Sequence, residues 1–126
     1  MPDDAREELV RKACRLCDAL RAPALMVISE SGRLAQTVAA HRPAQAIIYA
    51  FTASDVVRRK LWLLRSVVPF VIELLPNPEQ TVHNAFQKLK HHNRALPQDH
   101  VIVVTDVETS RGWVPSVQVR TFGNMA

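Results

Sequence analysis

The chain has 126 residues, of which 48% are hydrophobic, which is enough for one ordinary globular core and too little for two. We therefore expect a single domain over residues 1–126. Sixteen lysines and arginines against twelve acidic residues give a formal charge of +4, which is compatible with acidic small ligands. The basic residues are scattered and are not interleaved with aromatic side chains, which argues against nucleic-acid binding as the main function.

No segment has the features of a membrane span or a secretion signal. The longest apolar runs, such as residues 67–72, are far shorter than the roughly 20 residues that cross a bilayer, and the chain opens with Met-Pro-Asp-Asp. The two cysteines, Cys14 and Cys17, share one face of a predicted helix with leucine and valine, which favours core packing over a metal or redox site. Reduced cysteines fit a cytoplasmic location.

The first part of the chain predicts a helix, a strand and a second helix. Asp4, with a glutamate three residues later, is typical of the start of a helix that extends to about Arg21. Residues 24–28 are continuously apolar, as in a strand covered on both faces. A turn over residues 29–32 then leads into a helix that extends to about His41.

The middle of the chain repeats this plan. Residues 46–51 predict an apolar strand, and residues 56–64 predict a helix rich in arginine and leucine. A third apolar run over residues 69–75 predicts another strand. A long helix follows from residue 78 to about residue 95, with Asn77 as its cap and a proline at its first position.

The end of the chain predicts two strands, residues 100–105 and residues 116–122, joined by a loop over residues 106–115. Strands that alternate with helices indicate a parallel sheet with helices on both faces. The last connection is too short for a crossover, so the final strand should be antiparallel. We expect a three-layer α/β/α fold with a five-stranded mixed sheet. Its last strand, Ser116–Phe122, would form a sheet edge or the interface of a homodimer.

The turn over residues 29–32 could bind an anion. Ser29, Ser31 and Gly32 place two hydroxyls and several backbone amides at the amino end of a helix, where the helix dipole favours negative charge. Many α/β domains use such a turn only to reverse the chain. The residues alone therefore leave a phosphate pocket and a structural turn as alternatives.

A series of short motifs, in order along the chain, matches one known family. They are Ser29-Glu30-Ser31-Gly32-Arg33, Val38-Ala39, His41-Arg42-Pro43, Thr52, Arg59-x-Leu61-x-Leu63, Val67-x-Pro69, Asp99 and the strand from Val101 to Thr105. In these motifs and their spacing, residues 4–122 resemble the C-terminal domain of pyruvate kinase. The resemblance implies a five-stranded mixed sheet between helices, in agreement with the pattern.

The resemblance also implies a function without catalysis. In pyruvate kinase the chemistry belongs to a separate (β/α)₈ barrel, which a chain of this length cannot contain. The C-terminal domain is regulatory: it binds a sugar bisphosphate effector in the turn that matches Ser29–Leu34, and it pairs subunits through its last strand and first helix. The resemblance therefore implies a regulatory and dimerisation domain with no catalytic residue, cofactor or metal of its own.

Four residues at the turn are the expected contacts of an anionic ligand. Ser29, Ser31 and Gly32 match the family positions whose hydroxyls and amides hold one effector phosphate. Arg33 is the residue of this turn that can supply positive charge. We expect the turn to hold one small phosphate or carboxylate.

Other positions depart from the family pattern. Glu30 stands where effector-responsive members often carry lysine, Leu34 replaces a hydroxyl residue, and Thr81 stands where an arginine grips a second phosphate. These departures argue against a bisphosphate effector. Trp113 and Arg111 lie where the family's effector lid lies, so they are candidates for ligand contact, with packing against the sheet end as the alternative.

Several other hypotheses remain open from the sequence. The chain could be a fragment of a full pyruvate kinase, an interaction module, or a small enzyme of unassigned reaction that uses Arg33, Asp106, Glu108 or Trp113 at the carboxyl edge of the sheet. Trp62 lies among leucines and indicates core or interface packing. Adjacent His91 and His92 point in different directions on a helix and predict a solvated helix end rather than a metal site.

Overall fold

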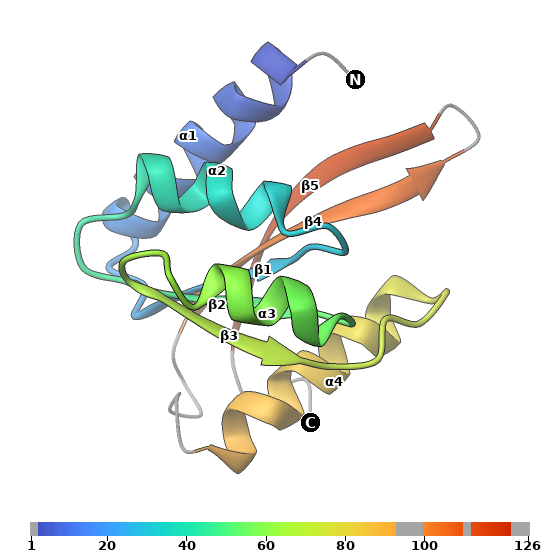
Figure 1. The fold of residues 1–126 in the computed structure, drawn as a ribbon. Helices are drawn as coiled ribbons and strands as arrows, with labels where there is room; N and C mark the ends of the chain where they lie inside the picture. The colour runs from blue at the N-terminus through green and yellow to red at the C-terminus, as the bar shows by residue number, and fades with distance from the viewer. Residues whose placement is uncertain (1–2, 93–99, 110–111, 122–126) are drawn as a thin grey trace.

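The computed structural model describes residues 3–92, 100–109 and 112–121, and it shows a five-stranded sheet with helices on both faces (Figure 1). In chain order the elements are α1 (Asp3–Ala19), β1 (Ala24–Ile28), α2 (Arg33–His41), β2 (Ile47–Thr52), α3 (Asp55–Leu61), β3 (Val67–Val71), α4 (Pro78–His91), β4 (His100–Thr109) and β5 (Gly112–Thr121). The strand order is β3-β2-β1-β4-β5, and β5 pairs antiparallel with β4. The predicted α/β class and the antiparallel last strand are confirmed.

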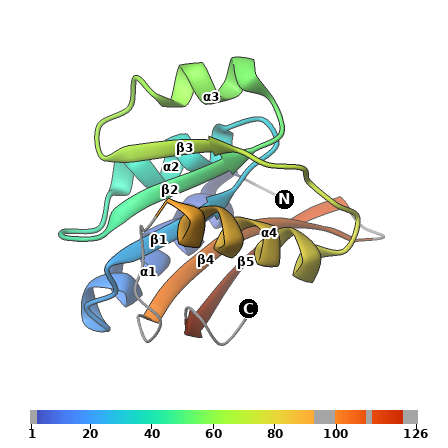
Figure 2. The same cartoon turned by 90° about the horizontal axis from the view of Figure 1, so that it is seen from below.

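Two apolar cores hold the helices on the sheet. Helices α1, α2 and α3 cover one face and α4 covers the other, as Figure 2 shows with α4 in front of the sheet and α1 behind it. The first core takes Val10, Ala13, Cys14 and Cys17 from α1, Leu34, Ala35 and Val38 from α2, and Leu61 from α3. The second takes Val82, Ala85, Phe86 and Leu89 from α4. Both cysteines are buried, which confirms their prediction as core residues.

The structure moves two predicted boundaries in the middle of the chain. Helix α3 ends at Leu61 rather than at residue 64, and β3 begins at Val67 rather than at residue 69. Two β-branched valines pair with β2 ahead of Pro69, and proline is tolerated there because β3 lies at the edge of the sheet. Helix α4 ends at His91, and residues 93–99 lie outside the described part.

The prediction of a loop over residues 106–115 is wrong. Strand β4 continues to Thr109, and β5 begins at Gly112, so that the two form a long hairpin with Val107 opposite Val114. Glycine and proline are more common in loops than in strands, but the edge position of β5 accommodates Gly112 and Pro115. The final strand is consequently longer than predicted, and Phe122 lies outside the described residues.

Candidate anion-binding site

The turn after β1 is built by hydrogen bonds of its own residues. The Ser29 amide donates to the Phe51 carbonyl oxygen at 2.9 Å and so extends the pairing of β1 with β2. The Ser29 Oγ then accepts the Gly32 amide at 3.0 Å. Gly32 has φ +85°, a backbone conformation that glycine adopts easily, and α2 begins at the next residue. Ser29 is buried, so its side chain forms the turn and keeps only its hydroxyl hydrogen for a ligand.

The turn also packs tightly against its neighbours. A Cβ atom at Gly32 would lie 2.8 Å from Cγ1 of Val57 on α3, so any other residue would force Val57 to shift. The Thr52 hydroxyl donates to the Glu30 carbonyl oxygen at 3.3 Å and ties the turn to the loop after β2. The backbone of this site is therefore held in one conformation by contacts on two sides.

Several hydrogen-bond donors at the start of α2 remain available for a ligand. The Arg33 amide donates to Ser31 Oγ at 3.3 Å, and the first helical hydrogen bond runs from the Gln36 amide to the Gly32 carbonyl oxygen at 3.0 Å. Within the described part of the chain, the amides of Leu34 and Ala35 have no acceptor, as expected for the first turn of a helix. The Arg33 side chain is exposed and makes no ion pair with another described residue. With the hydroxyl hydrogens of Ser29 and Ser31, the turn offers two amides, two hydroxyls and one guanidinium to an anion.

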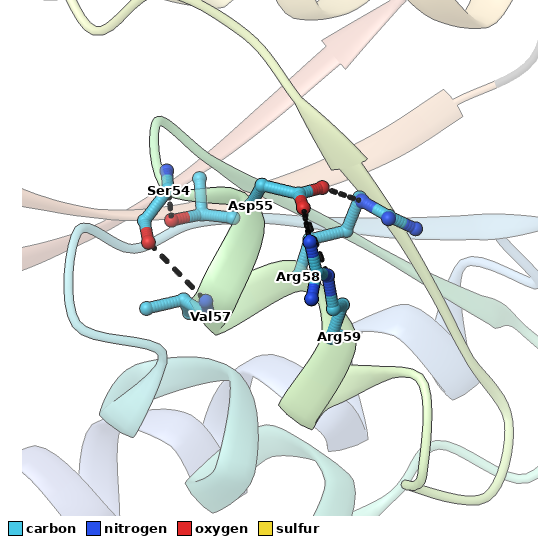
Figure 3. A network of polar contacts seen from close by, with 6 residues as sticks. Ser54, Asp55, Val57, Arg58 and Arg59 are labelled. Atoms are coloured by element: carbon cyan, nitrogen blue, oxygen red, sulfur yellow. Dashed lines mark hydrogen bonds and ion pairs between the residues drawn. The ribbon is translucent and has the colours of Figure 1, made fainter.

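The arginines of the neighbouring helix are already neutralised. Ser54 Oγ caps α3 by accepting the Val57 amide at 3.3 Å, and Asp55 binds both arginines of the same helix (Figure 3). Its Oδ1 lies 2.9 Å from Arg58 Nε and its Oδ2 lies 2.7 Å from Arg59 Nη2. The hydrogen bonds from Arg58 and Arg59 hold the pKa of the Asp55 carboxyl below its ordinary value.

The remaining predicted ligand residues come from the hairpin. Trp113 lies in β5 opposite Glu108, three residues beyond Thr105, which pairs with the last residue of β1. Its side chain is not described, and Arg111 lies outside the described residues. The structure therefore brings Ser29, Ser31 and Arg33 together, while contact of Trp113 and Arg111 with a ligand stays a prediction.

Thr81, which the resemblance placed at a second phosphate position, forms hydrogen bonds with the nearby backbone of Leu75. Its hydroxyl accepts the Leu75 amide at 2.9 Å and donates to the Leu75 carbonyl oxygen at 3.2 Å. Asn77 caps α4 as predicted, with Oδ1 accepting the Glu79 amide at 2.9 Å. The Thr81 side chain fixes the segment that leads into α4.

The carboxyl edge does not assemble an enzyme-like cluster from the side chains that are described. Asp106 Oδ1 lies 3.5 Å from Arg6 Nη2 and so joins β4 to α1. The side chain of Glu108 is not described. His91 and His92 are exposed at the end of α4, as the sequence predicted. No group of three or more histidine, cysteine or acidic side chains in the described part could hold a metal ion.

One ion pair of the structure was missed by the sequence analysis. Arg120 on β5 binds the carboxylate of Glu79 on α4, and its Nε also donates to Gln118 Oε1 at 2.8 Å. These hydrogen bonds from Arg120 lower the pKa of Glu79 from its ordinary value. The two partners are 41 residues apart, and no local pattern connects them.

Comparison with known proteins gives the family. The family model "Pyruvate kinase, alpha/beta domain" matches residues 7–118. The chain belongs to this family. The pyruvate kinase of Eimeria tenella is 27% identical over 113 residues, which are 89% of this chain and 21% of that protein. The chloroplastic pyruvate kinase isozyme A of Ricinus communis is 30% identical over 105 residues, which are 83% of this chain and 18% of that protein.

A solved pyruvate kinase has the same fold. The structure of Cryptosporidium parvum pyruvate kinase in complex with ADP matches with a TM-score of 0.85 and 25% identity, over 96% of this chain and 24% of that chain. The pyruvate kinase resemblance seen in the sequence is thereby confirmed. The chain spans only about a fifth of the length of the relatives it matches, between 18% and 21% in the two named above.

Proposed function

We propose that this pyruvate kinase α/β domain is a non-catalytic regulatory domain that binds one small phosphate or carboxylate at Ser29–Arg33. The observation that carries the proposal is the start of α2, where the amides of Leu34 and Ala35 have no acceptor in the described chain and Arg33 is exposed beside them. Helix N-termini with unpaired amides bind phosphate and carboxylate groups.

The same residues limit the ligand. A carboxylate such as Glu30, about 4 Å from a phosphate, would cost roughly 1 kcal/mol in water and roughly 4 kcal/mol at an intermediate dielectric constant. The Thr81 hydroxyl already bonds to the backbone of Leu75. A single anion with low charge, bound by Arg33 and the helix amides, therefore fits better than a sugar bisphosphate.

Ligand binding is testable by thermal shift and calorimetry with inorganic phosphate, sugar phosphates and nucleotides, including ADP. Phosphate should raise the unfolding temperature, Arg33→Ala should abolish the rise, and Glu30→Gln should strengthen binding. Arg11→Ala is the matched control, because Arg11 is an arginine on another helix that pairs with Glu8 at 2.6 Å. The proposal is wrong if no anion binds, or if Arg11→Ala weakens binding as much as Arg33→Ala.

We also propose a homodimer formed through the last strand, Ser116–Phe122. Strand β5 is an edge strand, and Val119 on it is 48% exposed. Edge strands with unpaired backbone groups can pair with a second copy. Light scattering should give a dimer for the wild type and a monomer for Val119→Lys. Val56→Lys is the control, since Val56 on α3 is 59% exposed and lies away from β5. A wild type that is monomeric at every concentration contradicts the dimer.

A second candidate is that the chain forms part of a longer pyruvate kinase. This candidate is favoured because the chain covers only 21% and 18% of the length of the two relatives named above. The coding sequence upstream of the codon for Met1 tests it: an in-frame stretch matching the rest of pyruvate kinase supports this candidate, and an in-frame stop codon contradicts it.

A cytoplasmic location is the remaining proposal. None of the helices in the described ranges could cross a membrane. By contrast, the pyruvate kinase isozyme A proteins of Ricinus communis and Nicotiana tabacum are chloroplastic. Microscopy of the tagged protein in its own cells tests the location, and fluorescence confined to an organelle contradicts it.

A further inference from the structure

Arg6 and Asp106 form an incomplete polar contact between α1 and β4. Arg6 Nη2 lies 3.5 Å from Asp106 Oδ1, which is longer than an ordinary hydrogen bond between nitrogen and oxygen. Arg6 Nε and Asp106 Oδ1 are both buried, and neither has a hydrogen-bond partner in the described part of the chain. This ion pair therefore contains one unsatisfied donor and one unsatisfied acceptor, an arrangement that is costly unless another group bonds to them.

The strand register places this pair beside the proposed anion site. Ile28, the last residue of β1, pairs with Thr105 of β4, so the residues that follow them, Ser29 and Asp106, are neighbours at the same edge of the sheet. Side chains alternate along a strand, and the valines two positions before Ser29 and Asp106 both belong to the first core. Both side chains therefore lie on the α1 side of the sheet. Adjacent strands are about 4.8 Å apart, so a small ligand at Ser29 can also reach Asp106.

The two unsatisfied atoms define the chemical group that fits between them. Arg6 Nε can only donate a hydrogen bond, and the carboxylate oxygen of Asp106 can only accept one. A hydroxyl group can accept the first bond and donate the second, whereas an ammonium group cannot accept and a phosphate oxygen without a proton cannot donate. Because the charges of Arg6 and Asp106 compensate each other, the pair favours a neutral group over a second phosphate.

We propose that Arg6 and Asp106 bind a hydroxyl group of the ligand whose anionic group is held at Ser29–Arg33, an inference that rests on the proposed function. The ligand is then a short hydroxylated anion, in which a small carbon skeleton joins the hydroxyl to a phosphate ester or a carboxylate. Each of the two side chains is 22% exposed, so a small solute can reach them. In the free protein an ordered water can make the same two bonds, and the ligand hydroxyl replaces it.

The test compares ligands that differ only in their hydroxyl groups. Calorimetry gives the dissociation constants of glycerol phosphate and propyl phosphate as one pair, and of lactate and propionate as the other. The hydroxylated member of at least one pair should bind about tenfold more tightly, because hydrogen bonds to charged groups contribute at least this much. A preference in the phosphate pair identifies a phosphate ester as the ligand, and a preference in the carboxylate pair identifies a hydroxy acid.

Two variants show whether the pair causes the preference. The double variant Arg6→Met/Asp106→Leu replaces both charges with apolar side chains of similar size, and it should bind both members of each pair equally. Glu7→Gln is the matched control, because Glu7 on the same helix joins α1 to α2 through His41 Nε2 at 3.0 Å and lies outside the Arg6–Asp106 pair. It should keep the preference. Unfolding curves verify that the variants are folded, and the wild-type comparison decides the proposal without any substitution.

Failure of this inference is distinguishable from failure of the proposed function. If propyl phosphate or propionate binds and neither hydroxylated ligand binds more tightly than its partner, the inference is overturned and the anion site stands. The inference is also overturned if the folded double variant keeps the preference, or if Glu7→Gln loses it. If none of the four compounds binds, both the inference and the proposed function are wrong.

Discussion

Replacing Gly32 with alanine tests how the turn after β1 is built. Gly32 has φ +85°, and an added Cβ would lie 2.8 Å from Cγ1 of Val57 and 3.5 Å from Cδ2 of Leu61. The left-handed backbone should cost an alanine about 1–2 kcal/mol, and the overpacking against Val57 should cost about 1–3 kcal/mol more. We expect Gly32→Ala to lower the free energy of unfolding by about 2–4 kcal/mol, measured by urea denaturation at unchanged slope.

A second variant separates the two contributions. Val57→Ala removes the Cγ1 atom that the new Cβ would meet, while it leaves the backbone of Gly32 as it is. In the Val57→Ala background, Gly32→Ala should therefore cost only the backbone share, about 1–2 kcal/mol. Equal costs in both backgrounds would show that the two residues are not in contact. A cost below about 0.5 kcal/mol in the wild-type background would refute the turn geometry altogether.

Three further predictions concern stability and reactivity. Ser66 has φ +66°, so Ser66→Gly should raise the free energy of unfolding by about 0.5–1 kcal/mol in urea denaturation, and a loss would contradict the left-handed backbone. Glu79→Gln should cost less than about 1 kcal/mol at neutral pH, since Glu79 is largely exposed. Arg120 lowers the pKa of Glu79, so this difference should disappear as the pH falls through the lowered pKa, and a difference that persists in acid would contradict the pairing. Burial raises the pKa of Cys14 to about 11 and of Cys17 to about 12, so neither should react with thiol reagents near neutral pH before unfolding.

The sequence predicted the parallel part of the fold because local signals and burial agree there. The continuous apolar run of β1 and the glycine before α2 are short-range features, and both elements form where they were expected. The hairpin was missed because Gly112 and Pro115, which ordinarily indicate loops, are accommodated at the edge of the sheet. Of the two alternatives for Trp62, core or interface packing, core packing is wrong, because the Trp62 side chain is 61% exposed.

The candidate site could be predicted in part. Ser29 and Gly32 were recognised because a strand, a tight turn and a helix leave a local pattern. The burial of Ser29 and its hydrogen bond with Gly32 depend on how the turn packs against α3. This tertiary packing cannot be inferred from the spacing of residues along the chain. The binding of Glu79 by Arg120 likewise depends on the tertiary placement of α4 beside β5.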